Sequence, residues 1–403
     1  MAVGLNPPGK LHQVEGIHLA SMHSGVKLDP QVKDLVLIEI NKDANVASVF
    51  TRNRFCAAPV IIARQHLVQN PKPRFLLINS GNANAGTGEI GLQQAIACCR
   101  AVAHSAAVNV SDVLPFSTGV IATELPLGCI EKSIPELVGD LDRDHWLQAA
   151  EGIMTTDTLA KAFSQQVKIQ DKTISITGIA KGSGMIKPDM ATMLSFIATD
   201  ALIEKPVLDS LLGQMISTSF NAITVDGDTS TNDACVLIAT GASGVTVSGS
   251  NSEFLKALQD VFQQLAQAII RDAEGATKFV EIEVQQAASC SDAREVAYTI
   301  AHSLLVKTAL FASDPNWGRI LAAVGRARIK NLEIGKVDLF LGEVCLLKSG
   351  LPDPDYSEEL GQAEMDLEEI RIVVNLNAGN DSATIWTSDL SYDYVKINAE
   401  YRS

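Results

Sequence analysis

The chain has 403 residues, of which 46% are hydrophobic and 20% are charged, and its formal net charge is −15. This length favours two domains or one large two-layer α/β domain. The acidic balance argues against general nucleic-acid binding and against an anionic-membrane partner, because both need clustered Lys and Arg.

The first half of the chain predicts buried strands separated by loops of small residues. Strands are expected at 34–40 and at 75–78, and the second leads into a small-residue loop, 79–86. A helix is expected from about 90 to 107. Residues 173–179 alternate like a strand with one solvent-exposed face and lead into a flexible loop, 180–185.

The second half repeats this alternation of strands and helices. The predicted elements are a strand at 193–199, a helix that starts near Pro206, a strongly amphipathic helix at 254–270, a strand at 280–284, one helix over 296–305, and mostly strands from 327 to 398. Strands and helices that alternate in groups indicate layered sheets with helices outside.

Several common signatures are missing from the sequence. It has no phosphate loop, no HExxH zinc helix and no GxSxG nucleophile elbow. The histidines form no ligand-spaced set, and the seven cysteines match no zinc pattern. No secretory signal opens the chain, and no apolar run reaches the roughly 18–20 residues of a membrane span. We therefore expect a cytoplasmic protein without a metal centre.

Three segments rich in Gly, Ser, Thr, Asn and Asp lie beside apolar strands, at 79–89, 178–192 and 224–233. Such loops are either plain turns or places where backbone N–H groups approach a ligand. The third contains Asp226, Asp228 and Asp233 but lacks the distal glutamate of an EF-hand, so a calcium site is not expected.

The segment 178–192 ends in Ala191-Thr192, a small residue before a hydroxyl residue that opens an apolar strand. A threonine at a newly made N-terminus carries its own general base, because its α-amine has an intrinsic pKa of roughly 7.7–8.0. This chemistry requires no histidine. An ordinary Ala-Thr bond before a strand is the alternative interpretation of the same residues.

Residues 178–201 closely resemble the self-cleavage segment of the ornithine acetyltransferase family, also called the glutamate N-acetyltransferase or ArgJ family. Further blocks that resemble the family lie in the same order along the chain, at 50–59, 79–88, 219–233, 314–320 and 394–403. The resemblance therefore extends over nearly the whole sequence.

The resemblance implies an α/β fold of the DmpA/ArgJ-like type, with layered sheets sandwiched between helices, in an N-terminal-nucleophile-type precursor that cleaves itself. It implies an α chain, 1–191, which ends at the scissile bond, and a β chain, 192–403, which begins with the nucleophile. The family associates these chains as an α2β2 assembly.

The resemblance also implies roles for individual residues. Thr192 matches the nucleophile, and Thr118 with Gly119 matches the pair that stabilises the tetrahedral oxyanion. The positions that match substrate-binding residues are Thr155, Lys181, Thr192, Glu274, Asn398 and Ser403. A lysine in a loop is otherwise usually solvated, and an acid at a helix end such as Glu274 is usually exposed.

The activity implied by the resemblance is acetyl transfer from N2-acetylornithine to glutamate by a ping-pong mechanism, without a cofactor. Acetyl-CoA is a possible second donor, which would make the enzyme bifunctional. Asp189 stands where the family usually has asparagine, and we expect this departure to tune self-cleavage and not to abolish it. The alternatives are a hydrolase or aminopeptidase with the same nucleophile, and a non-catalytic small-molecule-binding relative.

Overall fold

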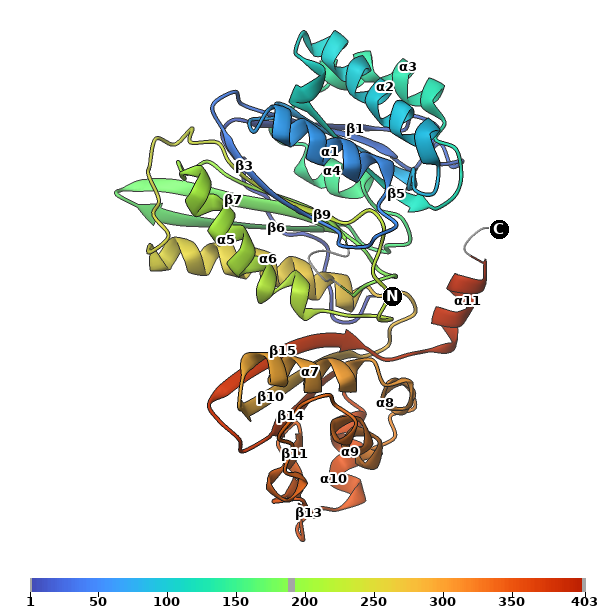
Figure 1. The fold of residues 1–403 in the computed structure, drawn as a ribbon, viewed down its shortest axis with the longest axis vertical. Coiled ribbons are helices and arrows are strands. Elements are labelled where there is room, and N and C mark those ends of the chain that lie inside the picture. Colours follow the sequence, from blue (N-terminus) through green and yellow to red (C-terminus); the bar gives the residue numbers. More distant parts are fainter. Residues whose placement is uncertain (1, 188–192, 401–403) are drawn as a thin grey trace. The chain divides into compact units, whose positions relative to one another are not determined.

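A computed structural model describes residues 2–187 and 193–400 of the chain. The chain divides into two compact units (Figure 1). The N-terminal unit comprises Pro7–Asn221 and Thr229–Ile269, and the C-terminal unit comprises Met1–Asn6, Ala222–Asp228 and Ile270–Ser403. Among the described residues, no helix is long and apolar enough to cross a membrane.

The first sheet of the N-terminal unit has the strand order β1-β2-β4-β5. Its strands are β1 (Ile17–Met22), β2 (Leu35–Ile40), β4 (Phe75–Asn82) and β5 (Val113–Val120). Strands β4 and β5 are parallel, and the other neighbours are antiparallel. One face packs against helices α1 (Ala58–Gln69), α2 (Gly88–Ala106) and α3 (Leu127–Gly139), which bury the apolar side chains of that face (Figure 1).

The second sheet has the strand order β3-β9-β8-β7-β6. Its strands are β3 (Asn45–Phe50), β6 (Lys161–Ile169), β7 (Lys172–Lys181), β8 (Leu194–Thr199) and β9 (Ala234–Ala239). Side chains of both sheets and of α4 (Trp146–Gly152) form one apolar core, which includes Ile38, Phe116, Phe196 and Val236. The two sheets therefore lie face to face.

Helices α5 (Lys205–Ser217) and α6 (Ser252–Arg271) complete the N-terminal unit beside the second sheet (Figure 1). Gly178 of β7 marks a close approach, because a Cβ there would lie 3.0 Å from the Leu265 side chain of α6. The unit is thus a stack of helices, sheet, sheet and helices. Short 3-10 helices occur at Val110–Asp112 and Phe220–Ala222.

The C-terminal unit is built on a sheet with the strand order β13-β12-β11-β14-β10-β15. The strands are β10 (Phe279–Ala287), β11 (Asp338–Leu341), β12 (Val344–Lys348), β13 (Leu351–Pro352), β14 (Glu369–Asn375) and β15 (Asp381–Ser388). The helices are α7 (Cys290–Ala301), α8 (Leu304–Phe311), α9 (Trp317–Gly325), the 3-10 helix Ile334–Lys336, α10 (Glu358–Met365) and α11 (Tyr392–Glu400).

The predicted alternation of layered sheets and helices is confirmed, and two predicted elements are wrong in extent. Strand β4 continues through Asn82, so half of the predicted small-residue loop is strand. The helix predicted over 296–305 is two helices, since Ser303 caps a new one by accepting a hydrogen bond from the Val306 N–H. Leu304 and Leu305 are consequently exposed rather than part of an apolar stripe.

Three further expectations are wrong, two of them on β7 and one at the end of the described chain. Strand β7 has no solvent-exposed face over Ile174–Lys181, because the first sheet covers one side and α6 the other. Lys181 belongs to that strand and not to a flexible loop. The predicted C-terminal strand pattern ends in a helix, α11.

Candidate active site

The predicted oxyanion residues lie at the carboxyl end of β5, beside β4. Gly119 has a φ of +133°, which side chains of L residues rarely adopt, and a Cβ there would lie 2.2 Å from the Gly81 carbonyl carbon. Only glycine lets the two strands approach so closely. Thr118, one residue earlier, is buried with 9% of its surface exposed.

Lys181 brings the second sheet into contact with this strand end. It is the last residue of β7, and its ammonium Nζ donates a hydrogen bond of 3.2 Å to Thr118 Oγ1. Both residues are buried. Two predicted site residues that stand 63 positions apart in the sequence are therefore neighbours. In this bond Thr118 is the acceptor, so its own O–H remains a donor.

Asn232 fixes the oxyanion segment from the loop before β9. Its amide Nδ2 donates to the Ser117 carbonyl at 2.9 Å and to the Ala83 carbonyl at 2.6 Å. Its Oδ1 accepts from Thr231 Oγ1 at 2.6 Å. A buried amide with its donors and acceptor satisfied holds a backbone in one position. Asn232 therefore sets the approach to Thr118.

Thr155 lies in the segment between α4 and β6, which Asp157 organises. The Thr155 N–H donates to Asp157 Oδ2 at 2.9 Å. Asp157 Oδ1 accepts from Lys161 Nζ at 2.6 Å and from the Gly182 N–H at 2.8 Å. The same carboxylate therefore contacts the Thr155 segment and the residue that follows Lys181.

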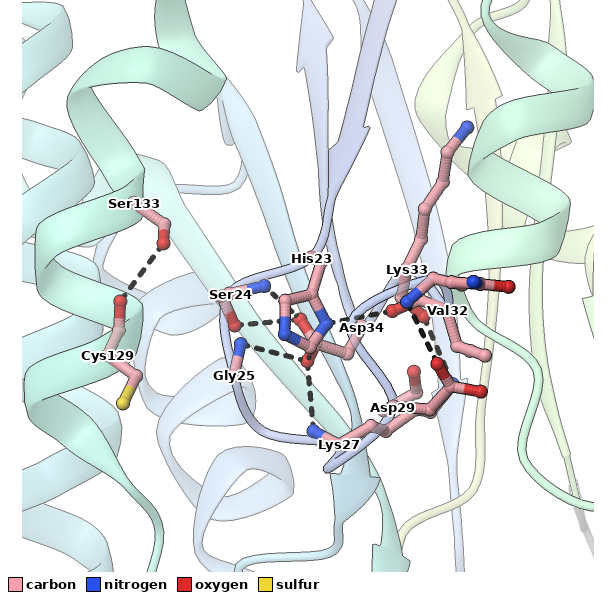
Figure 2. Close-up of polar contacts among 12 residues, drawn as sticks. His23, Ser24, Gly25, Lys27, Asp29, Val32, Lys33, Asp34, Cys129 and Ser133 are labelled. Atoms are coloured by element: carbon pink, nitrogen blue, oxygen red, sulfur yellow. Dashed lines mark hydrogen bonds and ion pairs between the residues drawn. The ribbon is translucent and has the colours of Figure 1, made fainter.

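The loop between β1 and β2 also reaches this region. Figure 2 shows the buried Asp34 carboxylate at the centre of the loop, accepting from Ser24 and from the Gly25 and Lys27 N–H groups. The Lys27 ammonium donates to the carbonyl of Met154, next to Thr155, at 2.7 Å. Burial lowers the pKa of Lys27, while Asp34 and Asp157 act in the opposite direction.

In the C-terminal unit, Glu274 and Asn398 form a separate pair. Asn398 Nδ2 donates to Glu274 Oε2 at 2.8 Å. Glu274 lies beyond the end of α6 and is buried, contrary to the exposure expected of an acid in that place. Tyr394 on α11 donates to Asp226 at 3.2 Å. Asn398 is thus held by a helix and is not part of a frayed tail.

Three predicted positions lie outside the described residues: Ala191 and Thr192 of the proposed cleavage site, and Ser403. The departure at Asp189 lies outside them as well. For metals, the described part of the chain contains no group of three or more His, Cys, Asp or Glu side chains that could hold an ion.

Sequence analysis missed Asp157, Lys161, Asn232 and Lys27. Asn232 stands in the polar block 224–233, whose composition is that of either a plain turn or a ligand loop. Asp157 and Lys161 carried one weak signal, an acid and a base four residues apart in a segment without helical periodicity. Only the fold shows that their side chains are buried.

The comparisons with known proteins agree over the full chain. The ArgJ family model matches residues 18–403. The chain is 52% identical, over all of both sequences, to proteins named arginine biosynthesis bifunctional protein ArgJ from Pseudomonas syringae pv. tomato and from Pseudomonas fluorescens.

A solved structure is also similar, the arginine biosynthesis bifunctional protein ArgJ of Bacillus halodurans. It is 43% identical with a TM-score of 0.50, and the match covers 52% of this chain and 100% of that one. The family match spans the predicted signature blocks, including both oxyanion residues and Lys181. The chain belongs to the ArgJ family.

Proposed function

We propose that this chain moves the acetyl group from N2-acetylornithine to glutamate through an acetyl ester on Thr192. The chain is an acyltransferase of arginine biosynthesis, as its family and its full-length relatives indicate. The observation that carries the detailed proposal is the contact of Lys181 with Thr118, which joins a cation and a hydroxyl donor in a buried position.

Self-cleavage comes first in this proposal. Thr192 Oγ attacks the Ala191 carbonyl, the acyl group moves from nitrogen to oxygen, and water hydrolyses the ester. The products are a carboxylate on Ala191 and a free α-amine on Thr192. The solved Bacillus relative supports a divided chain, since its whole chain matches 52% of this one, a share close to that of residues 192–403.

Acetyl transfer then proceeds in two halves. Thr192 Oγ attacks the acetyl carbonyl of N2-acetylornithine, and the α-amine takes the hydroxyl proton and passes it to the departing ornithine nitrogen. Glutamate next attacks the acetyl ester with its neutral amine, and the Thr192 oxygen regains a proton. Both halves pass through an anionic tetrahedral species.

The oxyanion of that species is assigned to Thr118 and Gly119. One lost oxyanion donor typically costs roughly 3–4 kcal/mol of transition-state stabilisation. Thr118 supplies an O–H, and Gly119 lets the backbones of β5 and β4 approach each other closely at this strand end. The positive charge of Lys181 next to Thr118 favours a negative charge developing there.

We assign substrate binding to Thr155, Lys181, Glu274, Asn398 and Ser403, in addition to Thr192. Lys181 suits a substrate carboxylate, and Glu274 suits an ammonium group. No step requires a metal or a cofactor. The cleaved chains are proposed to form an α2β2 assembly in the cytoplasm.

Acetyl-CoA is proposed as a second acetyl donor. The Pseudomonas relatives carry the word bifunctional in their names, and the same Thr192 ester would form from a thioester as from an amide. Incubation with acetyl-CoA and glutamate should then release free thiol together with acetylglutamate. Thiol release that does not depend on glutamate would instead indicate hydrolysis.

The main experiment measures cleavage and transfer on the same preparations. Intact mass and N-terminal sequencing of the wild type should give two fragments, the second starting at Thr192, and Thr192→Ala should give one chain. The wild type should make acetylglutamate from N2-acetylornithine only when glutamate is present. Acetate release without glutamate would favour the hydrolase, and an uncut inactive protein would favour the non-catalytic binder.

A further inference from the structure

The Asp157 carboxylate links two segments that are distant in the sequence. Its side chain is fully buried, and each of its two oxygens accepts hydrogen bonds from different partners. Oδ2 accepts from the Thr155 N–H, whereas Oδ1 accepts from the Gly182 N–H and from Lys161. The neighbouring hydroxyls of Thr156 and Ser183 add a second link of 2.6 Å between the same segments.

The charge state of Asp157 is set by its surroundings. Burial by itself would raise its pKa, but Lys161, Lys181 and the Gly182 N–H together bring the pKa well below the usual range. Lys161 is as buried as its partner, with an Nζ–Oδ1 distance of 2.6 Å. The carboxylate is therefore an anion held among cations inside the unit.

A buried ion pair such as Asp157–Lys161 usually adds little to the free energy of unfolding. Removing two charges from water costs several kcal/mol per ion, and apolar residues of similar volume are often as stable or more so. What an ionised carboxylate supplies is two acceptor oxygens in a fixed geometry. Here those two oxygens receive one N–H from each of the linked segments.

The linked segments each carry a residue assigned to substrate. Thr155 is itself one of the donors to Asp157, and Gly182 follows Lys181 directly. Gly182 has a φ of +146°, which turns the chain where β7 ends. Any shift of the Gly182 N–H therefore moves the backbone of Lys181, whose ammonium contacts Thr118.

We propose that Asp157 is a positioning residue for acetyl transfer, and that its two carboxylate oxygens act together with the adjacent Thr156–Ser183 hydroxyl bond. Both links are needed to fix Thr155 and Lys181 relative to each other and to Thr118. The inference rests on the proposed function of those residues. Asp157 itself touches no substrate in this scheme. Lys161 keeps the carboxylate ionised and in place.

The test separates positioning from stability by a charge-neutral double variant, Asp157→Asn with Lys161→Met. Asparagine has one acceptor oxygen, so the Thr155 or the Gly182 N–H loses its partner, while both members of the buried Asp157–Lys161 ion pair are removed together. Purified variants are assayed for acetylglutamate formation from N2-acetylornithine and glutamate, with kcat and KM determined for both substrates. Melting temperature is measured on the same samples.

The matched control is Asp200→Asn. Asp200 is also a buried carboxylate that accepts a backbone N–H, from Ser175 at 3.0 Å, but it contacts neither linked segment. We expect the double variant to melt near the wild type while its kcat falls about 10–100-fold, because misplacement of catalytic groups has costs of that size. Asp200→Asn should keep the wild-type kcat.

The proposal is overturned if the folded double variant keeps a kcat within about twofold of the wild type. It is overturned as well if Asp200→Asn loses the same activity, since the loss would then be general. A wild type that makes no acetylglutamate would refute the proposed function itself, which is a different result.

Should the double variant fail to fold, Ser183→Ala carries the test. It removes the hydroxyl link to Thr156 and leaves both charges of the Asp157–Lys161 pair in place. We expect an unchanged melting temperature with a kcat about 3–10-fold lower, in line with the loss of one hydrogen bond. An unchanged kcat in folded Ser183→Ala would overturn the proposal.

Discussion

At the scale of single residues, the site is made by lysine and aspartate side chains that the fold removes from water. Lys161 and Lys181 are buried, as are Asp34 and Asp157. Each such charge needs a partner, because an unpaired ion in the interior is strongly unfavourable. Lys181 has Thr118 as one partner and is assigned to a substrate carboxylate as well.

The first residue-scale prediction concerns the charge of Lys181. Lys181→Met keeps most of the side-chain length and removes the ammonium, so kcat/KM for N2-acetylornithine should fall about 10–100-fold, the range of a lost charge-assisted hydrogen bond. Steady-state assays of acetylglutamate check this. Lys172→Met, at the exposed beginning of the same strand, is the control and should be unaffected. Equal losses in both variants would contradict the assignment.

The second residue-scale prediction concerns pH and Asp200. Burial raises the pKa of Asp200 to about 6, although the Ser175 N–H acts against this. The native state then binds the proton more tightly than the unfolded state, so this group's stabilising contribution is complete below its unfolded pKa of about 3.9 and is lost as pH rises through the folded value.

Asp200→Asn should therefore be more stable than the wild type at pH 7.5, by about 1–3 kcal/mol, with the difference disappearing near pH 4. Denaturant unfolding at the two pH values measures it. The asparagine oxygen can still accept from Ser175, so no hydrogen bond is lost. A difference of the same size at both pH values would mean that the carboxyl does not titrate as described.

At the scale of elements, the site depends on how closely strands approach one another. Strands β4 and β5 pair in parallel from Phe75 with Val113 to Gly81 with Gly119. At that end the two glycines leave no space for a side chain. The oxyanion segment is thus defined by backbone contact as much as by the Thr118 hydroxyl.

Gly119→Ala tests this closeness. The added Cβ meets the Gly81 backbone at 2.2 Å in a backbone conformation that disfavours alanine, so we expect a loss of stability of about 3 kcal/mol or more and no detectable transfer. Thermal unfolding and transfer assays check both. Gly139→Ala, with nothing within 4 Å of its Cβ, is the matched variant. A wild-type melting temperature for Gly119→Ala would contradict the close approach of β5 to the Gly81 backbone.

Sequence patterns predicted the long elements because their burial is local and periodic. The stripe on α5 and the strand at β8 follow directly from apolar spacing. The course of β4 beyond Ile78 was not predictable in this way, because Asn79, Ser80 and Asn82 are polar residues that are buried. Their side chains bond to groups far along the chain, at Ser117, Gly152 and Thr123 respectively.

The site was predictable only where a family motif marks it. Thr118, Lys181 and Thr155 were identified through resemblance, and the structure brings Thr118 and Lys181 together. Asp157 was not identified, because its importance lies in contacts with Gly182, far along the chain. A buried ion pair has no signature in a single sequence.

At the scale of the whole molecule, the proposed cleavage would place two neighbouring strands of one sheet on different chains. Strands β7 and β8 pair antiparallel from Ile176 with Thr199 to Lys181 with Leu194. The division into 1–191 and 192–403 therefore runs through the N-terminal unit and does not follow the two compact units. Cleavage would leave the two chains joined by sheet hydrogen bonds and by a shared core.

We therefore expect the two fragments to stay together after cleavage. Size-exclusion chromatography in native buffer should elute both in one peak, whereas denaturing electrophoresis should resolve them. Mild denaturant below the unfolding transition should not separate them, because they share strand pairs and an apolar core. Fragments that elute apart in native buffer would contradict this shared-sheet arrangement.

The pairing of β7 with β8 has a consequence for recovery after denaturation. A precursor refolds as a single molecule, and its rate does not depend on how dilute it is. After cleavage, the two fragments would have to associate in solution before they could refold. Renaturation would then follow second-order kinetics, and the midpoint of the unfolding transition would rise with protein concentration. Self-cleavage would thus turn a chain that refolds alone into a two-chain enzyme that refolds poorly after unfolding in dilute solution.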